Sequence, residues 1–398
     1  MRAAEHAARD AYGRLLATLS CQFRDVEAAQ DALGDAFEKA LQRWPVDGVP
    51  DAPVAWLLTA ARRAIIDAGR HAAVVARGAR DVLPLLDAAV VPPASADRRV
   101  ELMLVCAHPD IDRRARAPLM LQTVLGLTAQ RMGAAFAVTP AALGQRLARA
   151  KRAIREKKIP FDLPEDGTRH ERLGDVLNAL YAAFGTGWED VTTAGDLRHG
   201  LAGEALWLCE LVAQQFADHA EAQGLAALMM FSQSRCAARR SAQGRFIPLA
   251  EQDRKLWDTQ MLRAADAYLA RAAALGESGR FQLEAAIQSH HVRTPVNVES
   301  VALLYEGLVR VAPTLASYVG RAAALGEARG AAAGLAALAI LERKQIASYQ
   351  PYWAVKAHLH ALAGQRPKAE EAYTMAIGLA VDPAVADYLT AQRAAIIR

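Results

Sequence analysis

Long apolar runs are missing from this 398-residue chain, and cysteines are few. No apolar stretch reaches about 18 residues, the length that a membrane-spanning helix needs. The first ten residues carry Arg2, Glu5 and Arg9, where a secretory signal requires an apolar segment. The 4 cysteines are widely scattered, which is typical of reduced thiols rather than of a disulfide framework. We therefore expect a cytoplasmic protein with no membrane partner.

Signatures of catalysis are also missing. The chain contains no P-loop, no G-x-S-x-G elbow and no H-E-x-x-H motif. The pairs Cys106/His108 and His290/His291 supply too few ligands for a metal, so we expect a core thiol, a capping or packing histidine and a surface histidine pair. No enzyme, metal site or cofactor is predicted. A catalytic site in the segment EQDRKLW, with Glu251, Asp253 and Arg254, is a remote alternative to salt bridges buried between helices.

Alternating segments long enough for a β-sheet are absent as well, whereas alanine-rich helical patterns run nearly from end to end. The chain is therefore predicted to be all-α, and its length indicates two or three domains. Proline-rich stretches divide it into residues 1–80, a linker at 81–97, residues 98–160 and a tail at 161–398. Residues 1–160 hold 24 Lys and Arg against 17 Asp and Glu, so a nucleic-acid interface is expected there.

The segment LGQRLARAKRAIREKK, residues 143–158, predicts a helix with two different faces. At about 100° per residue, one face is an apolar stripe and the opposite face is polar and basic. The stripe consists of Leu143, Leu147, Ala150 and Ile154, and the polar face of Gln145, Arg149, Arg152 and Arg155. Thr139 and Pro140 predict an N-cap and a first helical residue. With a shorter helix predicted in residues 127–139, this pattern indicates a helix-turn-helix with a basic recognition helix.

Two amphipathic helices are predicted in the first 80 residues. In residues 25–44 the outer face carries Asp31, Asp35 and Glu38, a charge of the wrong sign for DNA. In residues 55–71 the outer face carries arginines and an aromatic ring, a combination that suits single-stranded DNA. Its members are Trp56, Arg62, Arg63, Asp67 and Arg70. A tryptophan at such a position is more often a packing residue than a base-stacking platform, so both interpretations of Trp56 are kept.

The order of these motifs, with WLLTAARR, CAHPDID, KIPFDLPE and EQDRKLW, resembles the extracytoplasmic-function sigma factors of bacterial RNA polymerase. The similarity is to the subgroup in which two small helical sigma domains, the second a helix-turn-helix, precede a long helical extension. The resemblance implies core RNA polymerase and promoter DNA as partners. It assigns Asp31, Asp35 and Glu38 to polymerase, and Trp56, Arg62, Arg63, Asp67 and Arg70 to the melted −10 element. It assigns Thr139, Gln145, Arg146, Arg149 and Arg152 to the −35 element, with Lys151, Arg155, Lys157 and Lys158 on phosphates.

The tail contains one segment with tetratricopeptide spacing. It runs from Trp353 through His360, Gly364 and Tyr373 to Leu379, which predicts a helical pair whose partners stack upstream. The resemblance implies that this TPR-like extension regulates or supports sigma activity, with possible intramolecular contact to the sigma domains. Two other interpretations remain open: a sigma-derived DNA-binding regulator that no longer recruits polymerase, and a helical-repeat scaffold.

Overall fold

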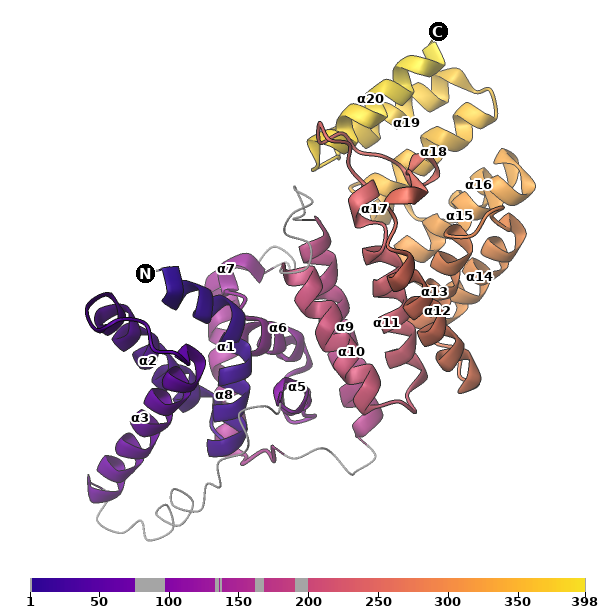
Figure 1. Cartoon of the computed structure of the whole chain (residues 1–398). Coiled ribbons are helices and arrows are strands. Elements are labelled where there is room, and N and C mark those ends of the chain that lie inside the picture. The colour runs from indigo at the N-terminus through magenta and orange to yellow at the C-terminus, as the bar shows by residue number, and fades with distance from the viewer. Residues whose placement is uncertain are drawn as a thin grey trace. The chain divides into compact units, whose positions relative to one another are not determined.

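The computed structural model describes residues 2–75, 97–132, 136, 138–161, 168–189 and 200–397, and these residues form helices and loops (Figure 1). Within those ranges the only bridge of β type joins Arg240 to Phe246. The all-α prediction is confirmed. The chain divides into a first unit, residues 1–185, and a second unit, residues 186–398.

The first unit begins with three helices, α1 (Arg2–Phe23), α2 (Val26–Asp47) and α3 (Pro53–Val75). The Asp25 side chain caps α2 by accepting hydrogen bonds from the amides of Glu27 and Ala28. Their shared core contains Leu15, Leu16, Leu19, Leu33, Trp44 and Leu57. The helix expected at 25–44 is therefore confirmed and extends through Pro45 to Asp47. The amphipathic pattern of residues 25–44 also predicts that Leu41 packs inward; this prediction is wrong, because Leu41 is 46% exposed.

Among the described residues, four further helices precede α9 in the first unit: α5 (Arg99–Cys106), α6 (Arg113–Leu125), α7 (Ala129–Met132) and α8 (Pro140–Glu156). The Thr139 hydroxyl accepts a hydrogen bond from the Ala142 amide, and Pro140 opens α8 as predicted. The four residues of the predicted apolar stripe are the buried residues of α8. The linker expected at 81–97 lies outside the described residues, except for Asp97.

The boundary between the units falls within α9 (Arg169–Glu189). Its residues Leu173, Val176, Leu177 and Leu180 are almost fully buried. This helix follows the predicted tail boundary at residue 160, yet most of it is grouped with the first unit. Within that unit an ion-pair contact, described below, joins α9 to α6.

The second unit is a succession of helices in which neighbours in sequence pack on one another (Figure 1). They are α10 (Leu201–Gln215), α11 (Ala220–Gln233), α12 (Thr259–Ala274), α13 (Arg280–His291), α14 (Val298–Val311), α15 (Leu315–Arg329), α16 (Ala331–Leu338), α17 (Arg343–Ile346), α18 (Gln350–Leu362), α19 (Arg366–Gly378) and α20 (Pro383–Ile397). A Cβ added to Gly224 in α11 would lie 2.6 Å from the Gln282 amide nitrogen in α13. Glycine therefore permits the close approach of these two helices.

The predicted pair in the tail corresponds to α18 and α19, which pack together and are joined by a turn in which Gly364 has a φ of 69°. Tyr373 is 4% exposed and Trp353 packs against the same core, as expected for seam residues.

The EQDRKLW segment differs from its prediction. Arg254 is exposed and donates hydrogen bonds to the carbonyls of Val292 and Arg293, so it forms no buried salt bridge. Asp253 instead accepts a hydrogen bond from the Lys255 amide, as a local cap.

Candidate nucleic-acid interface

The outer ridge of α8 is formed by Gln145, Arg149 and Arg152, which are all exposed. They lie opposite the buried stripe because helical positions three or four residues apart share a face. Within the part of the chain that the structure describes, none of the three has a hydrogen-bond or ion-pair partner. These side chains can therefore donate to an external acceptor such as a base edge or a phosphate.

The flanks of α8 are occupied by contacts within the first unit. On one flank, Arg146 donates to the Arg114 carbonyl at 3.5 Å. On the other, Lys151 donates to Gln30 Oε1 at 2.7 Å, and Arg155 pairs with Glu27 at 2.8 Å. Both of these acceptors belong to α2. The predicted DNA-contacting residues are thus divided into a free ridge and a flank that touches an acidic helix.

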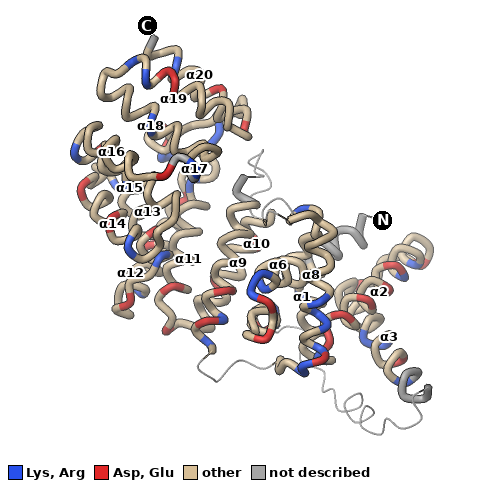
Figure 2. Tube along the Cα trace, turned by 180° about the vertical axis from the view of Figure 1, so that it is seen from behind, with Lys and Arg blue, Asp and Glu red and all other residues tan. Residues whose placement is uncertain are grey.

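Burial and neighbouring charges act in opposite directions on the pKa of Lys151. Partial burial lowers the pKa of its ammonium group, and the neighbouring carboxylates of Glu27 and Asp31 oppose that change. Figure 2, with Lys and Arg in blue and Asp and Glu in red, lets the opposite charges be followed along α8 and α2. The contact between these helices is electrostatically complementary.

The predicted −10 residues lie on α3. Trp56 is half-buried, and its ring packs edge-to-face on Trp44 with centroids 5.6 Å apart. That contact gives Trp56 a packing role in the core of α1–α3. Arg63, Asp67 and Arg70 are exposed, whereas Arg62 is half-buried. A long ion pair of 3.9 Å joins Arg70 to Asp67, so the two are held on the same surface.

The predicted polymerase-binding residues Asp31, Asp35 and Glu38 are all exposed on α2. A carboxylate face without apolar cover is suited to a basic partner surface. Glu27 and Gln30, which contact α8, belong to the first turns of the same helix.

Sequence reasoning missed Arg116. It is buried in α6, donates to the carboxylates of Asp175 at 2.6 Å and Glu171 at 3.2 Å, and also donates to the carbonyls of Pro109 and Ile111. The motif CAHPDID supplies those two carbonyls. An arginine flanked by Ala115 and Ala117 and followed by Pro118 carries no charge pattern that would have marked it as an interhelical residue.

The structure places no group of three potential metal ligands together among the residues it describes. Cys106 is buried, and burial raises the pKa of its thiol to about 12. His108 Nδ1 accepts a hydrogen bond from the Asp110 amide, which confirms a core thiol beside a capping histidine.

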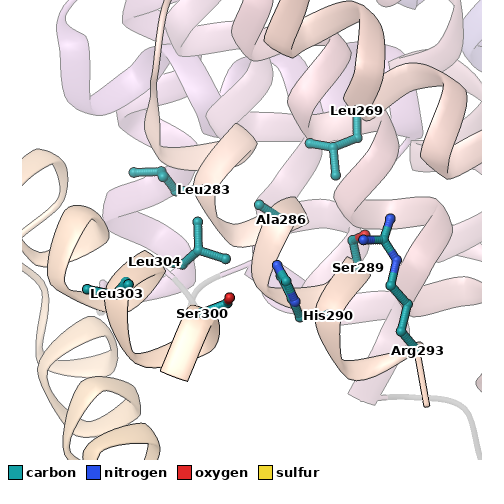
Figure 3. A pocket seen from close by; sticks show the side chains of 9 residues that line it. All are labelled: Leu269, Leu283, Ala286, Ser289, His290, Arg293, Ser300, Leu303 and Leu304. Atoms are coloured by element: carbon teal, nitrogen blue, oxygen red, sulfur yellow. The ribbon is translucent and has the colours of Figure 1, made fainter. Parts of the chain in front are cut away.

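A groove of about 460 Å³ lies between α12, α13 and α14 (Figure 3). Leucines from the three helices line it, with Ser289, His290, Arg293 and Ser300 on its polar side. Partial burial and Arg293 lower the pKa of His290. His290 and His291 are half-buried rather than a surface pair, which corrects the sequence interpretation. None of the predicted site residues lines this groove.

Comparison with known proteins adds two family matches. Residues 8–74 match Sigma-70 region 2, and residues 172–273 match a family of unknown function, DUF6596. An uncharacterised protein of Rhizobium meliloti (strain 1021) is 31% identical over 382 residues, which cover 93% of this chain and 90% of that protein. No solved structure matches the chain.

The helices α1–α3 thus form a sigma-70 region 2 domain. The sigma-70 family consists of non-enzymatic transcription factors. The match therefore supports a sigma-factor-like role in transcription initiation. With that domain followed by a second helical domain, the chain belongs to the same family as the Rhizobium meliloti protein. No helix among the described residues is both long and apolar enough to cross a membrane.

Proposed function

We propose that the protein is an extracytoplasmic-function sigma factor that binds core RNA polymerase and directs initiation at specific promoters. The proposal rests on the region 2 match over residues 8–74, together with the exposed basic ridge of α8. A helix-turn-helix built from α7 and α8 would place that ridge in the major groove at the −35 element.

The signs of the charges assign the acidic and the basic residues to different partners. In this proposal Asp31, Asp35 and Glu38 dock on polymerase, and the arginines of α3 contact the melted −10 strand. Gln145, Arg149 and Arg152 read base edges, because amide and guanidinium groups have the donor geometry for adenine and guanine. Thr139 acts as the cap that fixes the start of the recognition helix, and Arg146 flanks the reading ridge.

The TPR-like extension regulates or supports sigma activity in this proposal. The support for this role is the succession of packed helical pairs that follows the region 2 domain. Contact with the sigma domains would let the extension act on them directly. Stacked helical pairs present continuous surfaces of the kind that bind other protein segments.

The proposal is tested by adding the purified chain to core polymerase with a panel of promoter fragments. We expect specific transcripts that core polymerase alone does not start. A chain that binds duplex DNA but neither joins core polymerase nor starts transcripts would instead be the sigma-derived regulator, and a chain that does neither would be a helical scaffold.

A further inference from the structure

The groove between α12, α13 and α14 has an apolar side and a polar side (Figure 3). Its volume of about 460 Å³ is in the range of small-molecule pockets. Leu303 on the apolar side is 55% exposed, so much of this apolar surface is in contact with water. A ligand that covers it is stabilised by the removal of that surface from water. The apolar side consists of Leu269, Leu283, Leu303 and Leu304.

The polar side contains hydrogen-bond donors and no carboxylate. Among the described residues that line the groove, Arg293 is the charged one, and Ser289, His290 and Ser300 lie beside it. Partial burial and the nearby Arg293 lower the pKa of His290, so its ring is mostly neutral at pH 7. Within the part of the chain that the structure describes, neither the His290 ring nor the Ser300 hydroxyl has a hydrogen-bond partner. The lining thus carries a positive charge and donors that the fold does not use.

The guanidinium group of Arg293 is held only weakly by the fold. One of its nitrogens lies 3.5 Å from a carboxylate oxygen of Asp266, and the two side chains are 60% and 50% exposed. An ion pair this long and this exposed contributes little to stability. A guanidinium group has five N–H donors in a planar fork that matches a carboxylate. A ligand carboxylate can therefore bind Arg293 in place of Asp266 or beside it.

The helix ends beside the groove also favour an anion. Ser300 lies in the first turn of α14, where the helix dipole attracts negative charge. The end of α13 has the opposite sign, but Arg254 donates hydrogen bonds to the carbonyls of Val292 and Arg293. These bonds reduce the negative potential at that end. The polar side of the groove is therefore suited to a carboxylate rather than to a cation.

We propose that the groove between α12, α13 and α14 binds a small amphiphilic carboxylate. The aliphatic part of this ligand lies on the leucines, and Arg293 holds its head group. His290 and Ser300 offer further donors on the same side. This inference goes beyond the proposed function and does not depend on it, because the binding residues all belong to the second unit.

The ligand class is tested by calorimetric titration of the full chain with octanoate, hexanoate and octanol, all below micelle-forming concentrations. We expect octanoate to bind at one site per chain. Hexanoate should bind about tenfold more weakly, because it covers the leucines with two fewer CH₂ groups. Octanol has the same chain without the charge and should also bind about tenfold more weakly. Equal affinities for octanoate and octanol would overturn the proposal.

The polar side is tested with variants that change a single charge. Arg293→Gln should weaken octanoate binding by about fivefold or more and leave octanol binding unchanged. Arg263→Gln is the matched control, because Arg263 is an exposed arginine of α12 that does not line the groove. Asp266→Asn should strengthen octanoate binding by about two- to fivefold, because the competing ion pair with Arg293 is removed.

The apolar side is tested with Leu303→Asn, which should weaken octanoate and octanol alike, by about fivefold. Because Leu303 is largely exposed, we expect the melting temperature to stay near that of the parent. Val311→Asn is the matched control, since Val311 is 49% exposed on the same helix and does not line the groove.

Two results would overturn the proposal. One is the absence of octanoate binding, and the other is an affinity that neither Arg293→Gln nor Leu303→Asn changes, which would mean that octanoate binds elsewhere. Transcription with core polymerase needs none of these probes, so either result leaves the proposed function standing. A chain that binds octanoate in the groove but starts no transcripts would contradict the proposed function alone.

Discussion

The guanidinium group of Arg116, in α6, lies 2.6 Å from the carboxylate of Asp175, in α9. The Arg116 side chain is 7% exposed and that of Asp175 is 17% exposed, so the pair is largely shielded from water. Two backbone carbonyls of the CAHPDID motif accept further hydrogen bonds from the same guanidinium group. The first helix after residue 160 is therefore bound to the helices that carry the predicted −35 reader.

Replacing Arg116 should destabilise the first unit strongly. Arg116→Ala leaves the Asp175 carboxylate largely buried without its partner, and we expect a loss of about 3–5 kcal/mol in the free energy of unfolding. Arg113→Ala, an exposed arginine of the same helix, should change it by less than about 0.5 kcal/mol. Urea denaturation followed by circular dichroism measures both, and equal effects would contradict the role of the buried pair.

Truncation tests the same contact. A chain ending after residue 164 lacks Glu171 and Asp175, whereas a chain ending after residue 189 keeps both. We expect the longer chain to unfold at a clearly higher temperature and to bind a −35 duplex, and the shorter chain to lose both properties in part. If the two unfold alike, α9 does not stabilise the helices before it.

Charge reversal on α2 should separate polymerase binding from DNA binding. Asp35→Lys with Glu38→Lys places cations on the outer face, away from Glu27 and Gln30. We expect affinity for core polymerase to fall at least tenfold, because like charges then meet a basic surface. Binding of the −35 duplex should not weaken. A parallel loss in both assays would show that the variant disturbs the fold rather than a docking face.

Arg149→Ala should weaken binding to the cognate −35 duplex by about 1–3 kcal/mol and relax the preference at one base position. The reason is that Arg149 projects from the exposed ridge opposite the buried stripe. Titrations at several salt concentrations provide the check. A loss that is uniform across sequences, with a shallower salt dependence, would make Arg149 a phosphate contact instead.

We predict that the Asp382 carboxyl makes the stability of the second unit depend on pH. A hydrogen bond from Arg240 holds the pKa of the Asp382 carboxyl below its ordinary value of 3.8, and the Ala384 and Val385 amides add to this. The folded chain therefore keeps the carboxylate charged at pH values where the unfolded chain takes up a proton. The stabilisation is present above that ordinary value and is lost as pH falls through the lower folded-state pKa.

We accordingly expect Asp382→Asn to lower the melting temperature at pH 7 and the difference from the parent to shrink as the pH falls toward 3. Asp387→Asn, which changes an exposed carboxyl within α20, is the control and should leave the melting temperature near that of the parent. A difference that stays constant with pH would show that the charge of Asp382 does not contribute to stability.

Much of the local structure could be predicted because it depends on spacing within one helix. The stripe Leu143, Leu147, Ala150 and Ile154 is buried as expected, and the Thr139 cap begins α8. The prediction that Leu41 packs inward was wrong because Leu41 lies at the edge of the apolar arc of α2. At that edge the neighbouring helices determine whether a side chain is covered. Trp56 could not be assigned from periodicity, since its packing depends on Trp44 in another helix.

Residue order alone accounts for the helical class, the caps and the opposite faces of α2 and α8, because these follow from spacing at 3.6 residues per turn. Three contacts appear only in the packed molecule: Arg155 with Glu27, Arg146 with the Arg114 carbonyl, and Arg116 with Asp175 of α9. Such contacts join residues that are tens to more than a hundred positions apart. They form only when packed helices bring distant side chains within hydrogen-bond distance, and no periodicity along the chain encodes that approach.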